Sequence, residues 1–99
     1  MNNPRVKTEE EVREEFLACI RGYAEYWAKQ LGKTSLEKCN GLAFSILGIF
    51  DGVTIELPGM DIVLRPHESD QEFLQGIGRN WVEDGMVIND CQLHELFYE

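Results

Sequence analysis

The chain has 99 residues, of which 43% are hydrophobic and 10% are aromatic, and its formal net charge at pH 7 is −9. This length fits a single small domain over residues 1–99, and the apolar content excludes global disorder. The negative charge argues against nucleic-acid binding through a basic patch and against an anionic membrane surface. No apolar run is long enough for a membrane span or a signal peptide, so we expect a cytoplasmic protein.

The first predicted element is a long amphipathic helix. Thr8 and Glu11 have the spacing of a capping box, in which the hydroxyl accepts a backbone N–H and the carboxylate accepts another in return. An apolar stripe follows at steps of three and four residues, and the helix is expected to end near Lys29 and Gly32. The stripe consists of Val12, Phe16, Ile20, Tyr23, Trp27 and Leu31.

A second capping box, Thr34 with Glu37, predicts a second helix that ends at Asp51-Gly52. Residues 42–50 are apolar almost all round, so this helix should be the central buried element. Periodicity alone leaves residues 42–50 open to a buried strand, and the capping box favours the helix. Small residues spaced four and three apart share one face and would let the first helix or the sheet approach closely. They are Gly41, Ser45 and Gly48.

The next segment has the alternation of a β-hairpin. Residues 53–57 alternate apolar and polar, Pro58-Gly59 is a turn pair, and residues 61–65 return before Pro66. Residues 86–88 are a candidate third strand. The hairpin is expected to pack on the second helix through Val53, Ile55 and Leu57.

Two short helices are predicted in the last third. Residues 69–72 read as a third capping box that starts a helix ending at Gly76 or Gly78. A last helix is expected to be capped by Asn89 or Asp90. Its apolar residues are Leu93, Leu96 and Phe97. This order of elements predicts a small α+β fold.

The cysteines and histidines limit the chemistry that the chain can perform. Cys19, Cys39 and Cys91 include no CxxC pair, so we expect small buried hydrophobes and no disulfide framework or zinc site. Cys91 and His94 stand three apart on the predicted last helix, and with His67 they support an alternative, a small enzyme or a ligand- or metal-binding protein. No catalytic or metal-binding set is complete, so no catalytic, cofactor or metal residue is assigned and an enzyme is the less favoured class.

The negative charge is concentrated in the last third. Residues 1–33 carry no net charge, residues 34–66 carry −2 and residues 67–99 carry −7. Such an excess steers a protein toward a basic surface. We therefore predict a non-enzymatic protein-binding module of the inhibitor, immunity or mimic type. The candidate partner-binding residues are Glu68, Asp70, Glu72, Trp81, Glu83 and Asp84.

Two hypotheses about contacts stay open from the sequence. Trp81 fits either an interface anchor or the lid of a small core. The neutral first third would also allow a homodimer through Tyr23, Tyr26 and Trp27, with the acidic thirds pointing outward.

Four short segments resemble small bacterial and prophage-encoded proteins without assigned activity. They are Gly41-Leu42-Ala43-Phe44-Ser45-Ile46-Leu47, Asp51-Gly52, Leu57-Pro58 and Leu93-His94-Glu95-Leu96-Phe97. The resemblance extends over about residues 39–98. It implies a stand-alone bacterial or phage protein and transfers no catalytic residue.

Overall fold

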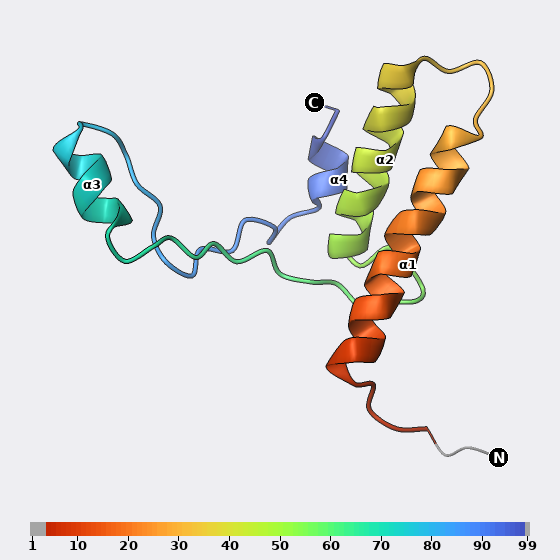
Figure 1. The fold of residues 1–99 in the computed structure, drawn as a ribbon, viewed down its shortest axis with the longest axis horizontal. Helices are drawn as coiled ribbons and strands as arrows, with labels where there is room; N and C mark the ends of the chain where they lie inside the picture. The colour runs from red at the N-terminus through yellow and green to blue at the C-terminus, as the bar shows by residue number, and fades with distance from the viewer. Residues whose placement is uncertain (1–3, 99) are drawn as a thin grey trace. The chain divides into compact units, whose positions relative to one another are not determined.

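The computed structural model describes residues 4–98, and the chain divides into two compact units. Unit 1 comprises Met1–Met60 and Gln92–Glu99, and unit 2 comprises Asp61–Cys91. Over the described residues the structure holds four helices and one isolated β-bridge (Figure 1). The predicted α+β class is therefore wrong, and the fold is mostly helical. None of the helices in residues 4–98 combines the length and the apolar character needed to cross a membrane.

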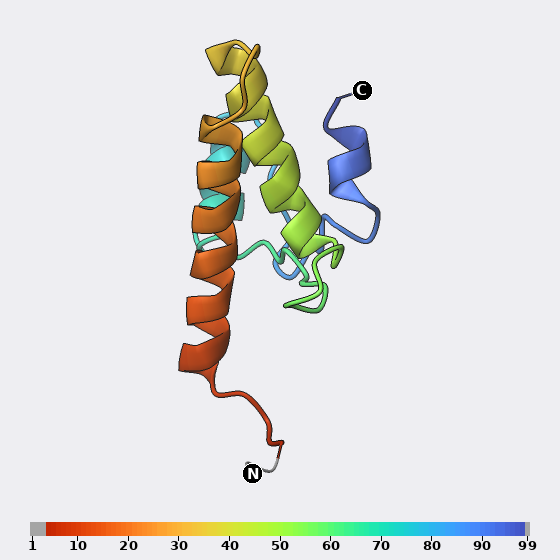
Figure 2. The same cartoon turned by 90° about the vertical axis from the view of Figure 1, so that its right-hand side faces the viewer.

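Helices α1 (Glu9–Ala28) and α2 (Ser35–Phe50) form the antiparallel hairpin of unit 1 (Figures 1 and 2). The Thr8 hydroxyl accepts the Glu11 N–H at 3.1 Å, and the Glu11 carboxylate accepts the Thr8 N–H at 3.1 Å. Thr34 and Glu37 repeat both bonds at the start of α2. Both predicted capping boxes are confirmed, and residues 42–50 are helical as favoured.

Small residues on α2 allow α1 to approach closely. A Cβ at Gly41 would lie 2.5 Å from the Trp27 ring, and the Trp27 Nε1–H donates to Ser45 Oγ at 2.9 Å. At the other end of the hairpin, the Phe16 and Phe50 rings are 5.7 Å apart. The predicted close approach of α1 is confirmed at two of the three small residues. The third small residue, Gly48, faces Val53 instead.

The predicted β-hairpin is absent, because residues 51–60 close into a loop at the end of α2. The Met60 N–H donates to the Phe50 carbonyl at 2.8 Å, and Gly52 takes a left-handed φ of +82° next to Gly59. The alternating segment therefore pairs with no strand. Of its three apolar residues only Leu57 is buried, at 3% exposure, whereas Ile55 is 99% exposed.

Helix α4 (Leu93–Leu96) lies beside α2 (Figure 2), and aromatic rings make the contact between them. The Phe44 ring lies 5.4 Å from the His94 ring and 5.6 Å from the Tyr98 ring. A last helix is thus confirmed, but it starts after Gln92 and neither Asn89 nor Asp90 caps it. The Asn89 side chain instead accepts the Ile62 N–H at 2.7 Å.

Unit 2 is a paired stem that carries helix α3 (Asp70–Gly76). The stem has one antiparallel bridge, Val63 with Val87, flanked by Leu64 N–H to Met86 O at 2.9 Å and Ile88 N–H to Ile62 O at 3.1 Å. Residues 61–65 therefore pair with the candidate third strand rather than with residues 53–57.

The third predicted capping box is also wrong. Ser69 has helical backbone angles and its side chain makes no capping bond. The hydroxyl lies 2.8 Å from His67 Nδ1 instead, and the Asp70 carboxylate accepts the His67 N–H at 2.9 Å. The start of α3 is thus bonded to His67, which lies three residues before Asp70.

Candidate functional site

A groove in unit 2 collects most of the predicted partner-binding residues. Its volume is about 840 Å³, and it is partly open to solvent. Four of the six predicted residues line it, namely Glu68, Trp81, Glu83 and Asp84. The other lining residues are Pro66, His67, Gln71, Val82 and Met86. The structure thus unites residues from both sides of α3.

Local backbone contacts explain why the two sides of this groove meet. The stem brings residue 64 beside residues 85 and 86, through Gly85 N–H to Leu64 O at 3.0 Å and Leu64 N–H to Met86 O at 2.9 Å. Gly85 has a φ of +83°, a left-handed conformation that suits glycine and turns the chain back after Asp84. The paired stem therefore holds Pro66 and Met86, on opposite sides of the groove's chain segments, close to one another.

The groove combines negative charge with an accessible indole. Trp81 is 42% exposed, and the acidic residues Glu68, Glu83 and Asp84 line the same groove. Unit 2 as a whole carries seven acidic and two basic residues, a formal charge of −5. Carboxylates form charge-assisted hydrogen bonds to Lys and Arg side chains, and an indole face attracts the same cations.

Two predicted residues lie outside the lining of the groove. Asp70 holds the His67 N–H at the start of α3, so its carboxylate has a structural role. Glu72 is in the first turn of α3, where negative charge interacts favourably with the helix dipole. Sequence reasoning missed four lining residues and considered His67 only for an enzyme, ligand or metal site, because no local spacing indicates that these residues share a groove. The four are Pro66, Gln71, Val82 and Met86.

The most enclosed polar contact in unit 1 joins Asp51 and His94. Asp51 Oδ2 accepts the His94 backbone N–H at 2.8 Å and lies 2.6 Å from His94 Nδ1, and the Asp51 side chain has no exposed surface. Burial raises the pKa of Asp51, but the bonds from His94 and from the Leu93 N–H outweigh it and the net pKa is lowered. Asp51 thus supplies the cap that Gln92 does not provide for α4.

The alternative enzyme or metal site was predicted from Cys91 and His94 on one face of the last helix. Cys91 precedes α4 rather than lying on it, so it does not share a helical face with His94. His94 is joined to Asp51, a residue that the sequence indicated only as a helix end. Among residues 4–98 no group of three or more His, Cys, Asp or Glu could hold a metal ion.

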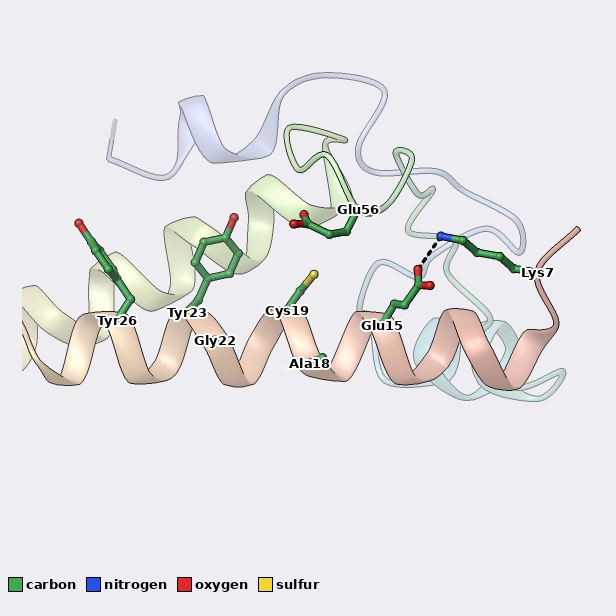
Figure 3. Close-up of a pocket in the computed structure, with 8 residues that line it drawn as sticks. All are labelled: Lys7, Glu15, Ala18, Cys19, Gly22, Tyr23, Tyr26 and Glu56. Atoms are coloured by element: carbon green, nitrogen blue, oxygen red, sulfur yellow. Dashed lines mark hydrogen bonds and ion pairs between the residues drawn. The ribbon is translucent and has the colours of Figure 1, made fainter. Parts of the chain in front are cut away.

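A second groove runs along α1 in unit 1 and has a volume of about 760 Å³ (Figure 3). It is lined by Lys7, Glu15, Ala18, Cys19, Gly22, Tyr23, Tyr26 and Glu56. Burial, followed by the charges of Glu56 and Glu15, raises the pKa of the Cys19 thiol, so the thiol stays protonated and weakly nucleophilic. Two residues of the predicted dimer contact, Tyr23 and Tyr26, line the groove, whereas Trp27 packs against α2.

Cys19, Cys39 and Cys91 are free thiols in the structure. Their predicted burial is wrong, because Cys39 and Cys91 are exposed and Cys19 is only partly covered.

Comparison of the chain with protein-family models, with curated proteins and with solved structures gives no match. What the grooves bind is therefore inferred from their own residues.

Proposed function

We propose that the protein is a non-enzymatic protein-binding module whose unit 2 recognises a basic segment of another protein. The observation that carries this proposal is the convergence of Trp81 with Glu68, Glu83 and Asp84 on one groove. A lysine or arginine side chain in the groove would contact both an indole face and carboxylates. An inhibitor, an immunity protein or a nucleic-acid mimic would use such a surface against a basic site.

The packing of unit 2 supports a role in binding. None of the residues 61–91 is buried, and large apolar side chains are exposed on them, including Phe73 at 64% and Ile77 at 52%. Ordering a segment of this length costs tens of kcal/mol in conformational entropy, at about 1–2 kcal/mol per residue for the backbone alone. A segment without a core gains its order from the partner, as segments that fold on binding do.

The charge of unit 2 indicates the kind of partner. Its basic residues are Arg65 and Arg79, against seven acidic residues. A second negative surface would be repelled, whereas a basic surface relieves the repulsion within unit 2 and accelerates association. The exposed apolar side chains would then add contact area around the charged groove.

A peptide titration tests this proposal. The probe is a short synthetic peptide rich in lysine and arginine, and the comparison peptide carries glutamine at every basic position. Isothermal titration calorimetry at low and moderate ionic strength should show binding of the basic peptide, with an affinity that falls as salt rises. Replacing three groove carboxylates, Glu68→Gln, Glu83→Gln and Asp84→Asn, should weaken binding by at least tenfold.

A matched variant separates a groove from general attraction between opposite charges. The substitutions Glu10→Gln, Glu14→Gln and Glu25→Gln remove the same charge from exposed positions of α1. This variant should bind the peptide within about twofold of wild type, and Trp81→Ala should weaken binding without any change in charge. Equal losses in both charge variants, or an unaltered affinity in Trp81→Ala, would refute the groove.

A further inference from the structure

Within residues 4–98, no contact of the structure requires glycine at position 22. Gly22 lies in the middle of α1, where glycine costs about 1 kcal/mol relative to alanine. It is not among the glycines with positive φ, and a Cβ there would meet no atom within 4 Å. Gly41 and Gly48 differ, because a Cβ at either position would lie within 3 Å of another side chain.

Gly22 lies instead on an unfilled groove. Ala18 and Gly22 leave a low stretch on α1, and Tyr23 and Tyr26 project beside it (Figure 3). Tyr26 is 54% exposed. The α1 face therefore offers both a hollow and a large, half-exposed aromatic side chain, whose ring lies edge-on to the Trp27 ring with centroids 5.2 Å apart.

The residues of this face are arranged symmetrically about Gly22. Ala18 and Tyr26 are each four residues from Gly22, and Glu15 and Lys29 are each seven residues from it. At 3.6 residues per turn, positions four and seven away point within about 40° of the same direction. We call these five residues the Gly22 face.

This symmetry makes the Gly22 face complementary to an antiparallel copy of itself. With Gly22 opposite Gly22, Tyr26 of each copy covers Ala18 of the other, so a large side chain meets a small one. Glu15 of each copy lies opposite Lys29 of the other, so negative charge meets positive charge. Among the described residues Lys29 makes no ion pair, and Glu15 pairs with Lys7 at 2.7 Å across a partly exposed contact.

The charge distribution also permits two copies to meet on α1. Residues 4–50 carry seven basic and seven acidic residues, so the hairpin of α1 and α2 has no net charge. Unit 2, at −5, would be repelled by its own copy. Contact between copies is therefore favoured on α1 rather than on unit 2.

From these observations we infer that two copies of this chain form a homodimer through the Gly22 face, with the two α1 helices antiparallel about a two-fold axis. Such an interface is isologous, since each copy contributes the same residues. The dimer contact uses residues of unit 1 alone, and it does not depend on the proposed function of unit 2.

Sedimentation velocity over a range of concentrations tests the dimer with the full chain. Wild type should reach the mass of a dimer, and Gly22→Leu should remain a monomer because the leucine fills the hollow. Gly22→Leu should also keep its helical circular dichroism, because the site is open within one chain and leucine favours helix. Ala28→Leu makes a similar change at an exposed α1 position outside the groove and should dimerise as wild type does.

Charge reversal tests the register. Glu15→Lys alone and Lys29→Glu alone each place like charges opposite one another twice per dimer and should weaken dimerisation by roughly tenfold. The double variant restores opposite charges and should return to within about twofold of wild type. A monomeric wild type, a dimer that persists in Gly22→Leu, or a double variant at least as weak as the single ones would overturn the proposal.

Discussion

Adding one methyl group at Gly41 should destabilise unit 1, although alanine favours helix over glycine. The new Cβ would lie 2.5–2.6 Å from three ring atoms of Trp27, well inside the ordinary contact distance of about 3.5–4 Å. The indole cannot move away without stretching its 2.9 Å bond to Ser45. Overpacking costs about 1–3 kcal/mol and the strained hydrogen bond about 1 kcal/mol, against a gain of about 1 kcal/mol in helix propensity.

Gly41→Ala should therefore lower the free energy of unfolding by about 1–3 kcal/mol. Urea denaturation followed by circular dichroism measures it. Gly22→Ala is the matched control, because a Cβ there meets no atom within 4 Å, and in dilute monomeric solution it should stabilise the chain by about 1 kcal/mol. If the two variants shift stability in the same direction and by the same amount, the contact between Trp27 and Gly41 is wrong.

The remaining predictions concern caps and protonation. Thr34→Ala should lower the free energy of unfolding by about 1 kcal/mol because it removes a formed cap, whereas Ser69→Ala, which removes none, should change it by a few tenths at most; equal losses in urea denaturation would contradict this. Asp51→Asn should lower the free energy of unfolding by about 1.5–3 kcal/mol and expose the amides of residues 93–96 to hydrogen exchange. The control variant Asp90→Asn, at an exposed position, should do neither. The pKa of Asp51 is lower in the folded chain than in the unfolded chain. The ionised carboxylate therefore stabilises the fold above the unfolded-state pKa, and this stabilisation is lost as pH falls through the folded-state pKa. The difference in stability between wild type and Asp51→Asn should therefore shrink below about pH 4, and a difference that is unchanged in stronger acid would count against this account.

The parts of the fold that depend on local chemistry could be predicted from the sequence. The capping boxes at Thr8 and Thr34 use bonds between residues three apart, so the starts of α1 and α2 follow from the sequence alone. The face of α2 that carries small residues could also be predicted, because Gly41 and Ser45 have helical spacing. The structure adds that Trp27 is the side chain that uses this face.

Contacts between distant residues could not be predicted in the same way. Residues 53–57 have strand periodicity, but they have no strand partner because the loop closes on the Phe50 carbonyl. Residues 61–65 pair with residues 86–88 and not with residues 53–57. Nothing in the local sequence pattern distinguishes these two possible partners. The sequence shows the excess of acidic residues in the last third of the chain. It does not show which of them line the groove and which stabilise α3.

Hydrogen exchange with and without the basic peptide tests the central claim, that the groove of unit 2 binds a basic segment. In the unbound chain the amides of residues 61–91 should exchange rapidly, because none of these residues is buried. Binding should slow exchange in residues 64–72 and 79–86, which line or flank the groove, and should leave α1 unchanged. Slower exchange confined to α1 and α2, or none in unit 2 at peptide concentrations that saturate the calorimetric signal, would contradict the account.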